Sequence, residues 1–77
     1  MATTTIDKAI VEDLINFKLK RIQTFISEIL DRWKEISATV FIEKARNGIY
    51  EDAENDAIEL RQLLAEENKL KTLLQKI

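Results

Sequence analysis

Carboxylates are the only side chains of this chain whose number and spacing could support a chemical site. The 77 residues contain no cysteine, no histidine and a single glycine. Zinc, iron–sulfur and haem sites, disulfides and histidine acid–base pairs are therefore excluded. The serine and threonine hydroxyls have no histidine to activate them, and no glycine-rich loop can hold a phosphate. We expect no enzymatic activity, no cofactor and no metal.

The strongest candidate is an acidic cluster over residues 51–59, whose members are Glu51, Asp52, Glu54, Asp56 and Glu59. Calcium-binding loops need a glycine at a set position, which this stretch lacks. Two interpretations stay open. The acids can stabilise the N-terminus of a helix through its dipole, or they can form a patch that meets a basic partner protein.

Glu67 is a second candidate because it lies inside an apolar stripe, formed by Leu60, Leu63, Leu64, Leu70 and Leu74. A carboxylate in such a stripe is either paired or lies where the stripe meets water. Lys71, four residues further on, can pair with it on a helix surface. The alternative is a specificity charge that faces a basic group on a partner.

Trp33 and Tyr50 are the aromatic candidates for an interface, because such side chains are enriched in binding hot spots. The other interpretation is structural. In that case Trp33 closes the core of a helical bundle and Tyr50 fixes a turn.

The absence of proline and the single glycine predict long helices with few breaks. Residues 1–5 are expected to form a polar lead-in, with Thr4 or Thr5 as the N-cap and Asp7 in the first helical turn. A long helix is then predicted over about residues 6–35.

A short second helix is predicted over residues 38–46. Ser37 is a good N-cap for it, and Ile36 and Phe41 occupy the positions of a hydrophobic staple. Gly48 can adopt the left-handed conformation that ends a helix. A third helix is expected over residues 52–76. The predicted fold is all-α, a single domain over residues 1–77 in which the third helix folds back on the first as a hairpin.

The long first helix carries a heptad pattern, which predicts self-association. Its apolar residues recur at spacings of three and four up to Ile36, as in a coiled-coil seam. A small domain without disulfides has a thin stability margin, and a second copy would bury its excess apolar surface. We therefore predict a homodimer, packed as a helical bundle, with the contact residues Leu19, Ile22, Ile26, Ile29 and Trp33.

A second apolar face lies on the first half of the same helix. Ile6, Ile10, Leu14 and Phe17 form this face, which is turned away from Leu19. Two apolar faces on one helix imply two packing partners. One is the rest of the chain, and we expect the other to be a second chain.

The charge is nearly balanced, with 12 basic and 14 acidic side chains and a net charge of −2. This balance argues against general nucleic-acid binding, and Lys18, Lys20 and Arg21 spread over more than one helix face. No apolar run exceeds three residues, so we expect no membrane span. The start of the chain lacks the layout of a signal peptide, which predicts a cytoplasmic protein.

The stretch over residues 48–54 (GIYEDAE), followed by Leu60 and by residues 63–70 (LLAEENKL), resembles the C-terminal arm of ParD-type antitoxins, which are small prokaryotic proteins. The likeness covers residues 41–77. ParD-type proteins bind DNA through an N-terminal ribbon–helix–helix segment, which has no counterpart in residues 6–35. The resemblance implies toxin binding through the C-terminal region, at Tyr50, Leu60, Leu63, Leu64, Glu67 and Leu70.

Together these patterns favour a non-enzymatic protein-interaction module, and the resemblance implies an antitoxin or inhibitor. Two alternatives stay open, a nucleic-acid-binding transcriptional regulator and a structural subunit of a larger assembly. The residues predicted to meet a partner are Tyr50, Asp52, Asp56, Glu59, Leu60, Leu63, Leu64, Glu67 and Leu70.

Overall fold

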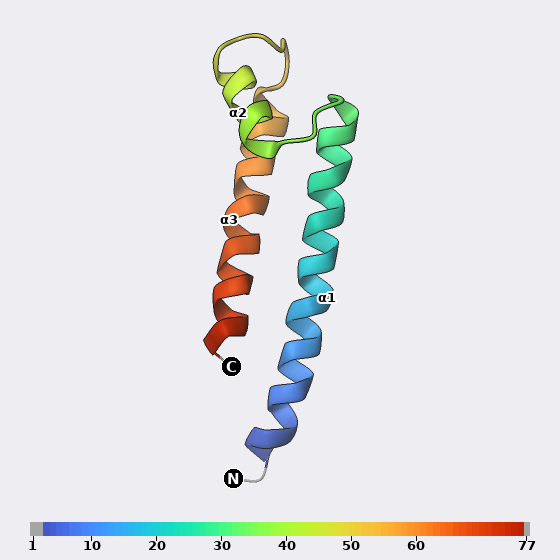
Figure 1. Ribbon diagram of the computed structural model, residues 1–77, viewed down its shortest axis with the longest axis vertical. Coiled ribbons are helices and arrows are strands. Elements are labelled where there is room, and N and C mark those ends of the chain that lie inside the picture. Colours follow the sequence, from blue (N-terminus) through green and yellow to red (C-terminus); the bar gives the residue numbers. More distant parts are fainter. Residues whose placement is uncertain (1–2, 77) are drawn as a thin grey trace.

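The computed structural model describes the backbone of residues 3–76 and the side chains of residues 8–76. It contains three helices, α1 (Thr3–Arg32), α2 (Ala38–Arg46) and α3 (Glu54–Lys76). α3 runs back alongside α1, and α2 packs at the end of the pair where the chain turns (Figure 1). The described residues contain no strand, so the all-α prediction is confirmed.

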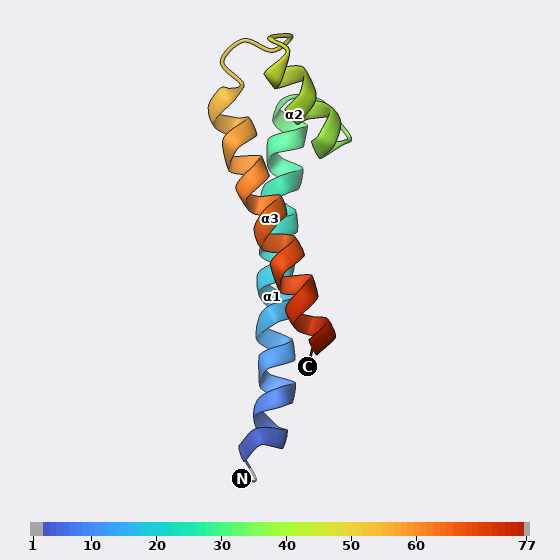
Figure 2. The ribbon, with the colours of Figure 1, turned by 90° about the vertical axis from the view of Figure 1, so that its left-hand side faces the viewer.

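The molecule is a narrow rod of 55 × 17 × 17 Å. The first turns of α1 project beyond the end of α3 in both side views (Figures 1 and 2). A hairpin of two helices has no third element along most of its length. Only the end that carries α2 is therefore three elements thick.

α1 begins and ends three residues before its predicted limits of 6 and 35. The predicted lead-in is helical from Thr3, so neither Thr4 nor Thr5 is the N-cap, and no acidic residue falls in the first turn. Threonine is only mildly unfavourable in a helix, which is why three in a row do not delay the start. Residues 1 and 2 of the lead-in lie outside the described residues.

The end of α1 is a Schellman motif built without glycine. The Glu35 amide donates to the Leu30 carbonyl at 2.9 Å, and the Lys34 amide donates to the Asp31 carbonyl at 3.1 Å. Lys34 holds the left-handed conformation that this motif needs, with φ 57°. Nothing in a lysine marks such a position, so the helix ends earlier than its apolar pattern predicts.

The limits of α2 are as predicted, because local chemistry fixes both ends. The Ser37 hydroxyl accepts the Val40 amide at 3.3 Å as an N-cap. Gly48, with φ 77°, completes a Schellman motif in which the Ile49 amide donates to the Lys44 carbonyl at 3.0 Å. The predicted staple is wrong, since Ile36 is 99% exposed and does not cover Phe41.

α3 begins at Glu54, two residues after the predicted start. Asp52 has a left-handed backbone, with φ 61°, and cannot belong to the helix. The first bond of the helix runs from the Ala57 amide to the Ala53 carbonyl, at 2.9 Å. The first turn carries Glu54 and Asp56, where carboxylates favour the helix dipole.

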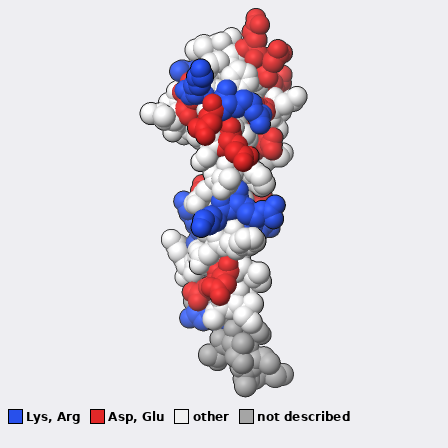
Figure 3. All heavy atoms as spheres, turned by 90° about the vertical axis from the view of Figure 1, so that its right-hand side faces the viewer, with Lys and Arg blue, Asp and Glu red and all other residues white. Residues whose placement is uncertain are grey.

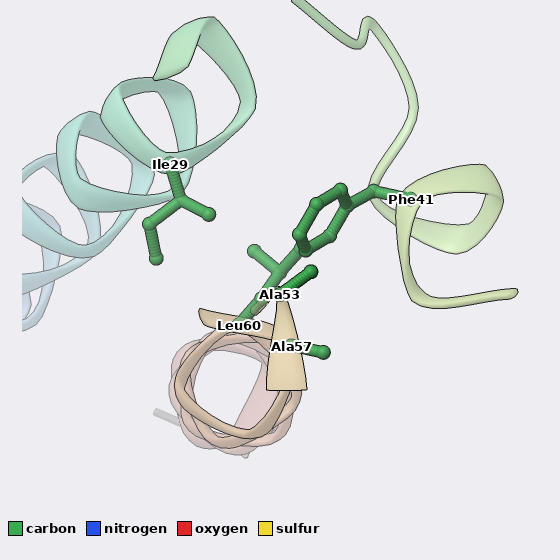
Figure 4. Packing of buried hydrophobic residues seen from close by; sticks show 5 residues of the cluster. All are labelled: Ile29, Phe41, Ala53, Ala57 and Leu60. Atoms are coloured by element: carbon green, nitrogen blue, oxygen red, sulfur yellow. The ribbon is translucent and has the colours of Figure 1, made fainter. Parts of the chain in front are cut away.

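The main core lies where the three helices meet. Phe41 and Leu60 are fully buried, and Ile29, Ala53 and Ala57 complete the cluster. Figure 4 shows Ile29 on α1 and Phe41 on α2, both directed toward the side of α3 that carries Ala57 and Leu60, with Ala53 just before the helix. We call residues 26–64 the closed half, and residues 8–25 together with 65–76 the open half.

The open half has a thinner core. Ile15, Leu19 and Ile22 are buried on the side of α1 that packs against α3. Their counterparts on α3, Leu70 and Leu74, are only half-buried. This pairing of two helices leaves the remaining faces of α1 open to water.

Candidate protein-interaction surface

A row of exposed apolar side chains runs along the open half of α1. The exposed fraction is 51% for Ile10, 62% for Leu14, 62% for Phe17 and 42% for Phe25. We call these four residues the α1 stripe. Helical geometry places the stripe about 120° around α1 from the face that packs on α3. Exposed apolar patches are common at the interaction surfaces of soluble proteins, because water solvates apolar side chains poorly.

Two grooves extend the stripe toward α3. The first is lined on α1 by Leu14, Phe17 and Phe25, and it reaches Glu66 on α3. The second continues along α3, where it is lined by Glu66, Leu70 and Leu73. Lys18 belongs to both grooves, and its Nζ lies 3.3 Å from a carboxylate oxygen of Glu66. The stripe and both grooves therefore form one surface that crosses the two helices.

Charged side chains border this surface. Asp13 and Lys20 are exposed on the flank of the stripe that lies away from α3. The Arg21 guanidinium lies 5.8 Å from the centre of the Phe25 ring, within cation–π range. Viewed from the α1 side, Figure 3 shows an acidic group and a basic band separated by uncharged surface. The two signs of charge are thus separated along the lower part of this view, whereas they are mixed in its upper part.

The residues predicted for self-association lie mostly inside the hairpin. Leu19, Ile22 and Ile29 are buried against their own chain, and Ile26 and Trp33 pack against the main core. A second copy could reach the buried three only by opening the hairpin. The homodimer stays a prediction, and the α1 stripe is an apolar surface of α1 that remains exposed.

The leucines predicted to meet a partner also serve the chain's own packing. Leu60 is fully buried, Leu63 and Leu64 pack against the main core, and Leu70 is half-buried. Part of this leucine row still reaches the surface, where Leu63 lines the first groove and Leu70 lines the second.

Asp56 joins α1 to α3. Its Oδ2 atom accepts hydrogen bonds from Trp33 Nε1 and from the Arg32 guanidinium, each at 2.8 Å. Asp52 and Glu59, the other acids predicted to meet a partner, are exposed. The acidic cluster is therefore divided between one carboxylate that holds the fold and others that face water.

Glu67 lies at the border of the leucine stripe of α3, with 18% of its side chain exposed. Its Oε2 atom accepts a hydrogen bond from Gln23 Nε2 at 3.1 Å and lies 3.8 Å from Lys71 Nζ. The carboxylate thus has partners on both helices of the hairpin, and the i,i+4 pair with Lys71 is formed.

A second polar group closes the turn between α1 and α2. The Glu35 carboxylate accepts hydrogen bonds from Lys44 Nζ, at 2.8 Å, and from the Tyr50 hydroxyl. The bond from Lys44, and after it the bond from Tyr50, lowers the pKa of Glu35. The same carboxylate raises the pKa of Lys44 and that of Tyr50.

The aromatic residues of the closed half pack as a trio. The ring centres of Trp33 and Tyr50 lie 5.1 Å apart, and Phe41 lies 5.6 and 5.7 Å from these two rings. Such distances are typical of favourable aromatic pairs. Trp33 and Tyr50 thus contribute to the structural packing of the closed half.

Another groove, between α2 and the start of α3, carries charges of both signs. Arg46 and Arg61 line it together with Asp52 and Glu54. Because the opposite charges are mixed, this groove offers no net attraction for a ligand of one sign. Among the side chains of residues 8–76, no group of three is placed to hold a metal ion.

Phe25, Glu66 and Leu73 belong to this surface but were not among the predicted site residues. Glu66, Leu70 and Leu73 recur at spacings of four and three, which places them on one side of α3. That spacing was visible in the sequence, but the side that faces the stripe depends on how α3 packs on α1.

No described helix is long and apolar enough to cross a membrane. Comparisons of this chain with known proteins find no matching family model, no similar curated protein and no similar solved structure.

Proposed function

We propose that this protein is a non-enzymatic protein-interaction module that binds its partner through the open half of α1. The observation that carries the proposal is the exposure of the α1 stripe, where Leu14 and Phe17 are each 62% exposed. Covering apolar surface contributes about 25 cal/mol per Å², so a partner that covers the stripe gains affinity. The adjoining grooves offer that partner a shaped contact rather than a flat one.

Photo-crosslinking in the cells that produce the protein tests this proposal. Phe17 is replaced by the photoreactive p-benzoylphenylalanine, and the matched control carries the same group at Asn16, which is exposed on the other side of α1. We expect a discrete protein adduct from position 17 and none from position 16. The absence of an adduct at position 17, or equal adducts at both positions, would contradict the proposal.

The resemblance to ParD-type antitoxins supports a more specific form of this function, an inhibitor that binds a basic protein. Glu51, Asp52, Glu54 and Glu59 are exposed near the turn before α3 and at its start, where they could face such a partner. The double variant Asp52→Lys, Glu59→Lys should then weaken the crosslinked partner's binding at least about tenfold. Unchanged affinity at physiological salt would remove the basic partner from the proposal.

A further inference from the structure

We propose that the α1 stripe binds the same stripe of a second copy, with the two α1 helices antiparallel, so that two hairpins form a four-helix bundle. This inference rests on the proposed function and adds the identity of the partner. It places the dimer contact on the exposed face of α1, leaving the buried seam within each hairpin.

The spacing of the residues fits such a contact. Ile10, Leu14, Phe17 and Arg21 follow one another at intervals of four, three and four residues, which is the interval of a coiled-coil seam. In an antiparallel pair with Leu14 against Phe17 of the second copy, Ile10 meets Arg21 of that copy. Arginine can pack its aliphatic stem there while its guanidinium reaches water at the end of the contact.

In this arrangement the charges beside the stripe of one copy complement the charges beside the stripe of the other. Asp13 and Lys20 lie one heptad apart on the same flank. When Leu14 packs on Phe17 of the second copy, each Asp13 faces Lys20 of the other chain, and two-fold symmetry makes the pair twice. Among residues 8–76, neither side chain forms an ion pair within its own chain.

A parallel pair is disfavoured by a residue of the seam itself. Two parallel helices in register place Arg21 against Arg21, and like charges that face each other are unfavourable. Arg21 therefore favours the antiparallel pair, in which it faces Ile10 of the second copy instead of another Arg21.

Sedimentation equilibrium of the full chain over about 1–200 µM tests the inference. The wild type should reach twice the 9.0 kDa mass of one chain. Phe17→Asp should weaken self-association at least about 100-fold, because it places a charge in the apolar contact. Ile49→Asp is the matched control, since Ile49 is 63% exposed at the other end of the rod and should not affect the dimer. Circular dichroism confirms that each variant keeps its helices.

Charge variants test the direction of packing without altering an apolar residue. Asp13→Lys and Lys20→Asp should each weaken the dimer about tenfold, since each replaces two attractive pairs by two repulsive ones. The double variant Asp13→Lys, Lys20→Asp should restore most of the affinity. A double variant as weak as the single ones would overturn the antiparallel register.

Other outcomes separate this inference from the function beneath it. A wild type that stays a monomer up to 200 µM, or a Phe17→Asp variant that dimerises normally, would show that the α1 stripe does not bind a second copy. If the crosslink from position 17 then joins a different protein, the interaction surface stands and only its occupant changes. A wild-type chain that stays monomeric, together with no crosslink from position 17, would contradict both proposals.

Discussion

The closed and open halves of the hairpin contain similar apolar residues but bury them to different extents. In the closed half, α2 adds a third element, and Phe41 and Leu60 lose all contact with water. In the open half only two helices meet, and Leu14 and Phe17 remain 62% exposed. A helix with two apolar faces needs two neighbours. α1 has both neighbours where α2 packs and one where α2 is absent.

The polar contacts differ in the same way. In the closed half, Glu35 binds two side chains and Asp56 joins Trp33 and Arg32, so the loops and helices are held at defined places. In the open half the helices are linked by the exposed pair of Lys18 and Glu66 and by the Gln23–Glu67 hydrogen bond. Exposed ion pairs contribute roughly 0.2–1 kcal/mol each. The fold is therefore held mainly by the closed half.

The largest expected difference between the halves is in the stability that is lost when a leucine is replaced by alanine. Leu60→Ala should reduce the free energy of unfolding by about 2–5 kcal/mol, because Leu60 is fully buried. Leu14→Ala should change it by less than about 0.5 kcal/mol in dilute solution, where the stripe faces water. Urea unfolding followed by circular dichroism measures both. Equal losses would show that the stripe belongs to the core.

The bond between Trp33 and Asp56 is expected to have the next largest effect. Trp33→Phe keeps an aromatic ring but removes the Nε1 donor, and should reduce stability by about 1–3 kcal/mol. Arg32→Gln is the control, because it removes only a pair in which the arginine side chain is 60% exposed. Arg32→Gln should reduce the free energy of unfolding by less than about 1 kcal/mol. If thermal melts show equal losses, the indole bond does not hold the closed half.

The smallest effect concerns pH and the Glu35 group. Because the folded pKa of Glu35 is lowered, its contribution is present above its ordinary pKa of about 4.3 and is lost as pH falls through the folded value. The pKa values of Lys44 and Tyr50 are raised, so their contributions are present below about pH 10 and are lost as pH rises through the folded values.

Stability should therefore be highest between these limits and fall on both sides. Glu35→Gln should flatten both slopes, as measured by denaturant midpoints from pH 3 to pH 11. The variant Glu59→Gln, at an exposed acid outside this group, is the control. A Glu35→Gln profile identical to that of the wild type would show that the group does not link stability to pH.

The sequence predicts best where local chemistry decides. Ser37 and Gly48 set the limits of α2 through a cap and a left-handed turn, and both were identified from residue type alone. Lys34 and Asp52 adopt the same left-handed conformation without being glycine, so the end of α1 and the start of α3 were misplaced. Residue type alone does not mark these two positions, because residues other than glycine adopt this conformation only uncommonly.

The assignment of the two faces of α1 could not be predicted for a related reason. A spacing of three and four residues shows that a helix face is suited to burial. It does not show whether that face packs on α3 or on a second copy. Leu19, Ile22 and Ile29 were assigned to a second copy, whereas α3 buries them. The second face, with Ile10, Leu14 and Phe17, is also visible in the sequence, and the structure leaves these three residues exposed.

Hydrogen exchange of the wild-type chain at two concentrations, about 1 µM and about 200 µM, tests the difference between the halves most directly. We expect the amides around Leu60 and Ile29 to be protected equally at both concentrations, because their own chain buries them. The amides of residues 10–25 should exchange faster at the low concentration and slow down at the high one. Equal protection of both halves at both concentrations would contradict a closed half that folds alone and an open half completed by a second copy.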